Sequence, residues 1–520
     1  MADSILRGEV MDHILYIMTD EQSLETISAL GAATHSTPAI DHLVRNGTFY
    51  SRAYTASPVC LPSRCVMMTG MMPHISGSMS NTTGASLSLE HPNLFTILGN
   101  AGFRTSLHGK CHFIPVPYPA TRSDQTLEYE HFITYYKALG IEHLDLQDGK
   151  NNSLWYYDDY SKEMEKKGRL KAYRDEIHMS PGKRALSDFP FGEDDHPDAW
   201  VGRKACERID SLARDEKAFV WVSFSGPHYP VDPPAEYMPL VDMAKDRGRV
   251  FSSDEWDDES KYHYNGFHGP GTTEGSGHAD DHAQKNYSED YWRAWRHRYF
   301  ANIVLIDRWI GRILESAKRK WGDDFAVIFT SDHGEMMGNH SLWGKNGSLF
   351  EDVLRVPLVV YQPGQEGRVE DALVCSDDIF PTIIKLAGAD CPYDPRRRGL
   401  PLDEDVARGG RKEIVSLCDG RLAIVRPPYK LEWNRYERTG RIYKEFYDLS
   451  KDPHEFVNSY MDEDYRGIID EMEVRLEQLE KEEGLLSSVF YVKGGGAMPF
   501  YVDFGEGAGY WNNHGLDVAR

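Results

Sequence analysis

Short apolar runs alternate with amphipathic stretches along most of the chain. We predict buried strands at His13–Thr19, Gly102–Leu107, Phe219–Phe224, Phe325–Thr330 and Val356–Tyr361, because each run is short, apolar and bounded by polar residues. Helical spacing predicts helices at Pro38–Gly47 and Tyr299–Lys318. The second has its apolar residues on one side, at Ile303, Ile306, Ile310 and Leu314. Strands that alternate with helices indicate an α/β fold, with a large, mainly parallel sheet flanked by helices.

The pattern changes after Gly388. A segment rich in Pro, Arg and Gly leads into short strand-like runs at 413–420, 422–426, 429–434 and 444–449 and a charged helix around Tyr465–Glu483. We predict a smaller C-terminal α+β subdomain with an antiparallel sheet. The domains expected are therefore residues 1–390, the main α/β domain that carries the chemistry, and residues 391–520, the subdomain and a tail. The tail is rich in Gly and aromatic residues, and its sequence gives it no placement.

Two regions depart from the α/β pattern. Residues 140–189 are polar and aromatic, and residues 247–282 hold a Gly/His-rich stretch. A connection of that length is typical either of a functional lid or of a mobile loop, and the sequence favours neither.

Composition narrows the classes of function. The formal charge of −24 argues against a nucleic-acid surface, which needs clustered Lys and Arg. It argues more weakly against a polyanionic substrate, whose approach a negative field slows. No stretch approaches the ~20 apolar residues of a membrane span. The segment Met1–Met11 lacks an apolar signal core, and the seven cysteines include no Cys-X-X-Cys pair, so we expect a cytoplasmic protein.

Polar groups follow four of the predicted strands. These groups are Asp20-Glu21 after the first strand, Lys110 and His112 after the second, His228 after the third and Asp332-His333 after the fourth. One such Asp is more often a helix N-cap than a ligand. Ligands of open α/β sheets bind at the carboxyl ends of the strands. Polar groups at four strand ends therefore favour one shared site over four separate N-caps. Carboxylates with a histidine suit a hard or borderline divalent cation.

The segment between the first two strands carries the most specific pattern. It contains Cys60, Pro62, Arg64 and Gly70. Pro62 suits the first turn of a helix and Gly70 its end, so Cys60 is predicted at a helix N-terminus, where an anion is favoured. Arg64, one turn later, can return a forked donor to the same place. A buried core thiol and an ordinary thiolate nucleophile remain open for Cys60 on these grounds.

The order of these motifs resembles the sulfatase family, the formylglycine-dependent type within the alkaline phosphatase superfamily. The resemblance covers most of the chain. It is carried by Met18-Thr19-Asp20, Cys60-Leu61-Pro62-Ser63-Arg64, Met68-Thr69-Gly70, Gly109-Lys110-Cys111-His112, Gly226-Pro227-His228, Ser331-Asp332-His333-Gly334, Trp343-Gly344-Lys345, Arg355-Val356-Pro357, the 445–449 segment (EFYDL) and Asp452-Pro453.

The resemblance implies a cofactor and a modification. Cys60 would be oxidised to formylglycine by a formylglycine-generating maturation enzyme. One divalent cation, with Ca²⁺ expected first and Mg²⁺ or Mn²⁺ next, would be bound by residue 60 together with Asp20, Asp332 and His333. Glu21 stands where many relatives have a second aspartate, and Glu21 or Gln22 would complete the ligands. His333 stands where many relatives have Asn, a change that bears on metal preference.

The resemblance also implies catalytic roles. Arg64, Lys110 and Lys345 would hold the sulfate oxygens. One hydroxyl of the hydrated formylglycine would attack sulfur while His228 or Lys345 protonates the departing alcohol. His112 would then help to remove the proton of the second hydroxyl, which releases sulfate. Losing one such contact should cost about 3–4 kcal/mol, by analogy with oxyanion-hole donors.

Other residues have weaker claims. His74 and Asn81 follow the signature and could line the pocket or hold a loop. We interpret His340 as a loop residue and Trp155-Tyr156-Tyr157 as packing.

Alternatives to the sulfatase hypothesis remain. Within the superfamily, a phosphonate monoester hydrolase or phosphodiesterase is the second reading: Lys110 with His112 argues against it, and Asp332 with His333 mildly favours it. A thiol hydrolase that uses unmodified Cys60 and a non-catalytic binding protein are the others. The charge and the expected compartment favour a small organic sulfate or a short saccharide sulfate as substrate. The sequence leaves the oligomeric state unknown.

Overall fold

The computed structural model describes residues 10–491 except for 82–85, 115–126, 129, 151–155, 179–185, 187, 253–254, 256–257, 263–286, 346–347 and 437–439. Trp155, most of the 247–282 stretch and most of the C-terminal tail lie outside the described residues.

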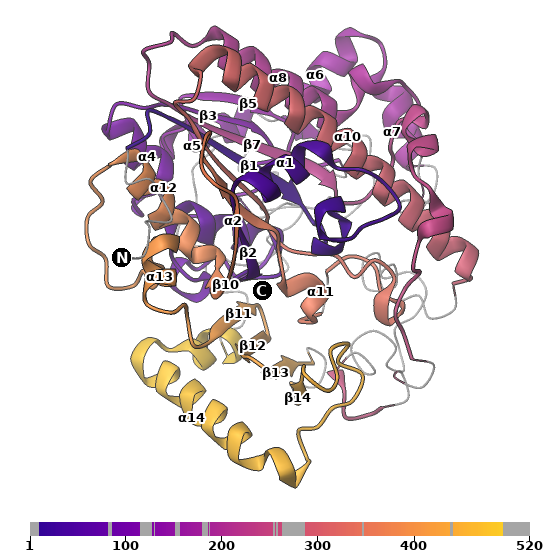
Figure 1. The fold of residues 1–520 in the computed structure, drawn as a ribbon, viewed down its shortest axis with the longest axis vertical. Coiled ribbons are helices and arrows are strands. Elements are labelled where there is room, and N and C mark those ends of the chain that lie inside the picture. The colour runs from indigo at the N-terminus through magenta and orange to yellow at the C-terminus, as the bar shows by residue number, and fades with distance from the viewer. Residues whose placement is uncertain are drawn as a thin grey trace.

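An eight-stranded sheet forms the centre of the protein, in the order β10-β2-β9-β8-β1-β7-β3-β5 (Figure 1). Its strands are β1 (His13–Asp20), β2 (Thr48–Tyr54), β3 (Arg104–Gly109), β5 (His143–Leu146), β7 (Ala218–Pro227), β8 (Ala326–Ser331), β9 (Leu358–Tyr361) and β10 (Arg368–Cys375). Every pairing within this sheet is parallel except those of β9, which runs antiparallel to β2 and β8. The predicted mainly parallel sheet is confirmed.

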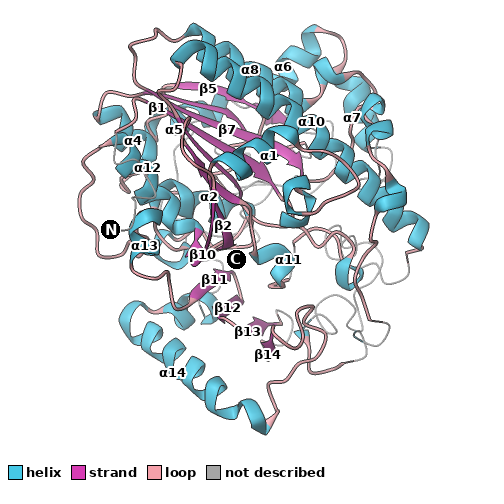
Figure 2. Cartoon of the chain, in the orientation of Figure 1, coloured by secondary structure: helices cyan, strands magenta, loops and turns pink. Residues whose placement is uncertain are grey.

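Helices cover both faces of this sheet (Figure 2). Because side chains alternate along a strand, Leu15 and Ile17 of β1 enter one hydrophobic cluster while Ile14, Tyr16 and Met18 enter the other. The first cluster includes residues of α1 (Pro38–Asn46), α8 (Pro197–Ser211) and α10 (Glu289–Trp321). The second includes residues of α2 (Cys60–Thr69), α4 (Leu94–Asn100), α5 (Glu130–Ala138) and α12 (Ile379–Ala387). The strands therefore end between two helical layers.

Shorter elements complete the main body. They are α3 (Pro73–Ser76), β4 (Leu127–Glu128), β6 (Tyr156–Tyr157), α6 (Asp159–Lys166), α7 (Leu170–His178), α11 (Glu351–Leu354) and α13 (Leu402–Ala407). Among the described residues, no helix combines the length and the apolarity that crossing a bilayer requires.

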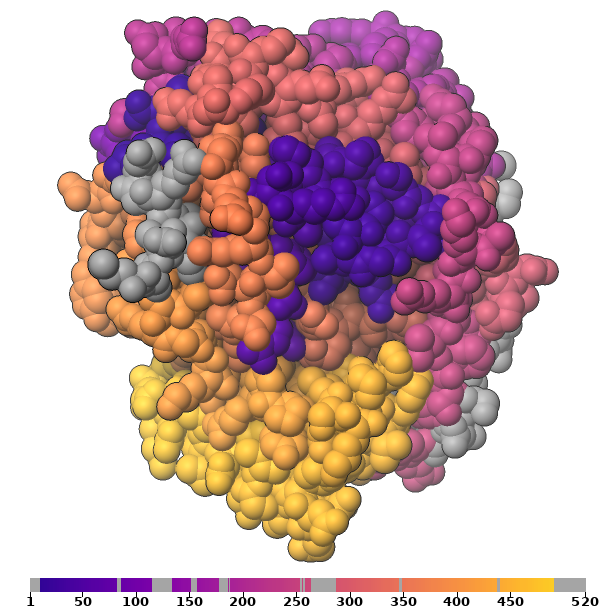
Figure 3. Space-filling view, viewed as in Figure 1, coloured from indigo at the N-terminus to yellow at the C-terminus, as the bar shows by residue number. Residues whose placement is uncertain are grey.

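A four-stranded antiparallel sheet forms the C-terminal part, as predicted. It consists of β11 (Ile414–Cys418), β12 (Arg421–Arg426), β13 (Tyr429–Arg435) and β14 (Ile442–Asp448), and α14 (Arg466–Glu483) packs against it. The hydrophobic cluster beneath α14 also contains Val66 and Met72, so this part shares its core with the main body, and Figure 3 shows the two in contact. Leu402 of α13 still belongs to a cluster of the large sheet. The boundary after residue 390 stays a prediction.

Several elements differ in extent from their predictions. Helix α10 is longer at both ends than the predicted helix, because Ser288 caps its N-terminus and Gly322, at φ +70°, ends it. Strand β3 starts two residues late, after Gly102 at φ +87°. Strands β2, β5 and β10 were not predicted. The first half of β10 (368–371) is half-buried or exposed, so apolar content did not mark it as a strand.

Candidate active site

The predicted strand-end residues meet at one edge of the large sheet. Asp20 is the last residue of β1, and Asp332 follows β8 directly. Lys110 follows β3, and His228 follows β7. These strands are neighbours and parallel, so their carboxyl ends lie together.

Cys60 begins helix α2, as predicted, and is buried beside this edge. Pro62 lies in the first turn, and Gly70 ends the helix in the left-handed conformation at φ +70°. The backbone N–H of Leu61 donates to Oδ1 of Asn81 at 2.9 Å, which fixes the start of the helix. The helix places residue 60 where its unpaired amide groups favour negative charge.

Four buried side chains form a candidate metal centre. One ligand atom each from Asp20, Cys60, Asp332 and His333 lies within 4.8 Å of the others. The Sγ of Cys60 lies 3.3 Å from Nε2 of His333 and 3.8 Å from Oδ1 of Asp20. Burial raises the pKa of Asp20, yet Lys110, His228 and Arg64 together lower it to about 2, so this carboxylate is ionised at neutral pH. Two carboxylates and an imidazole fit a hard or borderline divalent cation.

Arg64 joins the helix to the strand ends. Its Nε donates to Oδ2 of Asp332 at 2.9 Å, and Nη2 donates to Oδ2 of Asp20 at 3.3 Å. Nη1 donates to the carbonyl of Lys110 at 2.9 Å and to the Ser223 hydroxyl at 2.8 Å. Lys110 Nζ in turn pairs with Oδ2 of Asp20. The two cations thus compensate the carboxylates of the cluster.

Glu21 lies beside the four-residue cluster rather than in it. Its Oε2 accepts from Lys345 Nζ at 3.2 Å and lies 3.2 Å from Nε2 of His228. Asp20, Glu21 and His228 form an adjoining group of donors within 4.8 Å. Glu21 therefore holds two of the predicted catalytic residues in place, and its role as a cation ligand stays a prediction.

His112 adopts a left-handed backbone conformation, at φ +50°. The amide groups of His112 and Cys111 both donate to Oδ1 of Asp148 at 2.9 Å, which fixes this turn. Burial lowers the pKa of the His112 imidazole, so the ring is neutral at neutral pH and can accept a proton. A side-chain hydrogen bond with Cys60 opposes this effect of burial and places the ring beside residue 60.

Three cationic side chains lie close enough to residue 60 to act on its charge. Burial alone would raise the pKa of the Cys60 thiol, but Lys110, Lys345 and His333 hold it well below its usual value. A site that stabilises a negative charge so strongly suits an anionic group such as a sulfate ester.

Comparison with known proteins identifies the family. Residues 12–389 match the family described as Sulfatase.

The chain belongs to the sulfatase family. It is 28% identical over 503 residues to the arylsulfatase of Clostridium perfringens (strain 13 / Type A), which covers 93% of this chain and 97% of that one. It is 25% identical over 474 residues to the choline-sulfatase of Rhizobium meliloti (strain 1021), covering 88% of this chain and 84% of that one. This sulfatase is accordingly a sulfuric ester hydrolase.

Solved structures share the fold of this sulfatase. The phosphonate monoester hydrolase of Agrobacterium radiobacter has a TM-score of 0.71 at 21% identity, covering 90% of this chain and 95% of that one. At that identity the similarity shows the fold alone.

Three residues that contact the candidate site of this sulfatase were not found from the sequence. They are Ser223, Asp148 and Glu335. Ser223 interrupts an apolar strand, and Asp148 follows a strand, which are the signals that could have revealed them. Glu335 Oε1 accepts from the amide groups of Met337 and Gly344 and thereby orders the loop before Lys345. Burial and the facing carboxylate of Glu21 raise the pKa of Glu335 well above its usual value.

The weaker candidates lie outside the cluster. His74 lies 3.6 Å from the carboxylate of Glu483 on α14, and Asn81 caps the start of α2. His340 Nδ1 contacts Oε2 of Glu255 at 2.6 Å and the ring stacks on Phe350, which is a loop role.

Proposed function

We propose that this sulfatase hydrolyses a small organic or short saccharide sulfate ester, with formylglycine made from Cys60 as nucleophile and one bound divalent cation. One observation carries the proposal: residue 60 begins a helix whose N-terminus faces Asp20, Asp332 and His333, with Arg64 and Lys110 beside them. A buried core thiol would have apolar neighbours, and a buried thiol amid these charged groups calls for a chemical role.

The cation is assigned to Asp20, Asp332, His333 and residue 60, whose donor atoms lie close enough to share one ion. Its chemistry would be to neutralise charge on the sulfate oxygens and on the nucleophile. We expect Ca²⁺ first, because carboxylate oxygens dominate the donors, and Mg²⁺ or Mn²⁺ next. Glu21 remains the proposed additional ligand.

At residue 60, hydrated formylglycine would supply one hydroxyl to attack sulfur and a second whose deprotonation would release sulfate and restore the aldehyde. A maturation enzyme must oxidise Cys60 before folding ends, since Cys60 is 1% exposed in the folded chain. His112 is assigned to accept the proton of the second hydroxyl, since its neutral ring lies beside Cys60.

Arg64, Lys110 and Lys345 are assigned to the sulfate oxygens. We assign His228 as the general acid that protonates the leaving alcohol. Its side chain keeps 13% of its surface exposed, against 3% for Lys345, so it lies nearer the solvent into which the alcohol departs. Nδ1 of His228 contacts the carbonyl of Tyr229 at 2.7 Å, and Oε2 of Glu21 lies 3.2 Å from Nε2, so both ring nitrogens have a partner and the ring is oriented.

The proposed compartment is the cytoplasm. None of the seven cysteines forms a disulfide, as a reducing compartment requires. Fractionation of the producing cell tests this assignment, and recovery of the active enzyme outside the cytoplasm would contradict it.

The deciding experiment combines mass spectrometry with a substrate panel. Oxidation replaces the CH₂SH of Cys60 by an aldehyde, so the peptide should be lighter and should react with hydrazines. Aldehyde-bearing protein should hydrolyse small aryl, alkyl or sugar sulfates faster than phenyl phosphonate. Cys60→Ala should abolish turnover, whereas Cys206→Ala, on the outer part of α8, should keep it. Full activity with an unmodified Cys60 would indicate a thiol hydrolase, and a preference for the phosphonate would indicate a phosphonate monoester hydrolase.

A further inference from the structure

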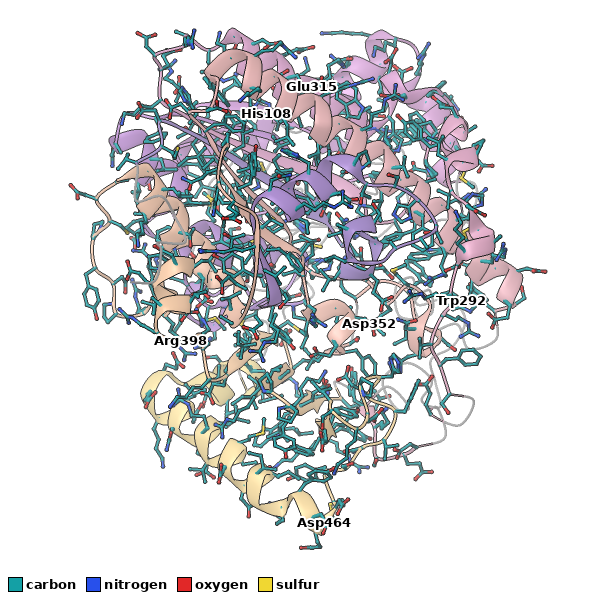
Figure 4. The ribbon with its side chains drawn as sticks, viewed as in Figure 1. His108, Trp292, Glu315, Asp352, Arg398 and Asp464 are labelled. Carbon is teal, nitrogen blue, oxygen red and sulfur yellow. The ribbon has the colours of Figure 1, made fainter. Side chains whose placement is uncertain are left out.

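A cluster of two histidines and an aspartate lies away from the active-site cluster, on the two strands at one end of the large sheet. Strand β5 is the edge strand and pairs in parallel with β3, with His108 opposite Asp145 and Ser106 opposite His143. Since side chains two apart on a strand point to the same face, His143, Asp145 and His108 share one face of the sheet. Figure 4 shows His108 beside the ribbon of these strands.

The three side chains converge on one point. Oδ2 of Asp145 lies 2.8 Å from Nδ1 of His108 and 2.9 Å from Nε2 of His143. One ligand atom from each lies within 4.8 Å of the others. The His108 side chain is fully buried, Asp145 is 19% exposed and His143 is 42% exposed. A cation from the solvent could therefore reach the three donor atoms on the side of His143.

We propose that His108, His143 and Asp145 bind a borderline divalent cation of the Zn²⁺ class at a second metal site. Two imidazole nitrogens and one carboxylate oxygen are the donors that Zn²⁺ accepts, and a water completes a tetrahedron. Ca²⁺ takes six to eight oxygen ligands and does not suit this set. The proposal does not depend on the function proposed for residue 60.

Neighbouring groups orient the three donor side chains and favour the protonation states that a cation needs. Nε2 of His108 lies 3.2 Å from the hydroxyl of Ser106, which holds the ring with Nδ1 towards Asp145. Burial lowers the pKa of His108, so a nitrogen lone pair is available, and the two histidines hold the pKa of Asp145 below its usual range although burial raises it. The positive charge of Arg208 on α8 also lowers the pKa of His108. The same charge would repel a bound cation and so weaken its binding.

The site links two strands that supply active-site residues. Strand β3 leads directly to Lys110, and β5 leads to Asp148, which fixes the turn at His112. A cation bound by both His108 and Asp145 would link β5 to β3. It would thereby stabilise the carboxyl ends of both strands. Its role is structural, and the expected effect is on stability.

Zinc binding to the full chain tests the proposal. Protein stripped with EDTA is saturated with Ca²⁺ to fill the active site, and Zn²⁺ is then titrated by calorimetry and bound zinc counted by elemental analysis. We expect His143→Ala to bind one zinc fewer than the wild type and to lose the zinc-induced rise in Tm. His454→Ala, at an exposed histidine elsewhere, should match the wild type.

His143 is 42% exposed, so its loss should change the metal-free Tm little, and the zinc-induced rise is measured from each variant's own metal-free Tm. Asp145→Asn, which keeps the shape of the side chain, should weaken zinc binding at least tenfold. Co²⁺ in place of Zn²⁺ should give visible absorption bands that His143→Ala lacks. Equal zinc content in the wild type and His143→Ala would overturn the proposal and leave the cluster as a hydrogen-bond network.

Discussion

Arg64 and Asp332 form an ion pair from which solvent is entirely excluded: Nε donates to Oδ2 at 2.9 Å, and neither side chain has any exposed surface. The pair joins the first turns of α2 to the end of β8, two segments separated by 268 residues. It therefore connects the Cys60 motif to the proposed cation ligands.

Removal of Arg64 should cost both stability and activity. Arg64→Ala removes one buried donor each from Asp332, Asp20, the Ser223 hydroxyl and the Lys110 carbonyl. Breaking a buried pair typically costs about 3–5 kcal/mol, and we expect that loss in the free energy of unfolding. Turnover should fall by about 10²–10³, as for a lost oxyanion-hole donor. Denaturant titration and initial rates measure the two effects.

An exposed pair provides the control for Arg64. Lys171→Ala removes the pair with Asp175, whose side chains are 87% and 56% exposed, so little stability should be lost. An Arg64→Ala variant as stable and active as Lys171→Ala would contradict the assignment.

Replacement of His333 should change the preferred cation. His333→Asn exchanges an imidazole nitrogen for an amide oxygen, which hard cations favour. After EDTA removes the cation, activity should return with Ca²⁺ in this variant, while the return with Mn²⁺ should be weaker than in the wild type. His340→Asn, in the loop that contacts Glu255, should leave the order of the ions unchanged. An unaltered order in His333→Asn would exclude His333 as a ligand.

Two glycines should respond oppositely to alanine. At Gly226 a Cβ would lie 2.3 Å from Oδ2 of Asp198, whose other carboxylate oxygen accepts from the Gly226 amide. Gly226→Ala must therefore displace Asp198 or the segment that carries His228, and we expect kcat to fall at least tenfold. At Gly311, inside α10, a Cβ would lie 3.6 Å from that of Ala39, an ordinary contact. Gly311→Ala should therefore stabilise the protein by about 0.5–1 kcal/mol, with kcat unchanged. Equal kcat in both variants would show that the Gly226 segment does not position His228.

His35 should make the protein less stable in mild acid. Burial lowers the pKa of His35 to about 4, and the ring hydrogen-bonds with the Thr34 hydroxyl and the Thr26 carbonyl. The unfolded chain takes up the proton near pH 6.5 and the folded chain only near pH 4, so stability is complete above pH 6.5 and is lost as pH falls between these values. Between pH 7.5 and 5 the loss should be about 2 kcal/mol.

Denaturant titrations at the two pH values test the role of His35. His35→Gln should lose about 2 kcal/mol less than the wild type over this interval, and exposed His454→Gln should lose as much as the wild type. The same loss in His35→Gln and the wild type would assign the pH dependence to other groups.

Much of the fold and of the candidate site could be predicted because the signals are local. The apolar run at β1, the Pro62 and Gly70 that bound α2, and the short antiparallel strands all depend on neighbours within a few residues. Polar residues directly after strands marked the site, because parallel strands deliver their carboxyl ends to one edge. Strand β9 shows the limit: its apolar run predicts a strand, but its antiparallel direction depends on which strands lie beside it.

The sequence by itself determined the local positions of the candidate residues: Cys60 at a helix start, Asp20 at the end of a strand and Asp332 directly after one. Only the tertiary structure decided their partners, such as Ser223 and Asp148 or the pairing of Glu21 with Lys345. It also decided that His108 meets Asp145. The physical reason is that helix starts and strand ends follow from local backbone preferences, whereas hydrogen bonds between distant residues depend on strand order and register.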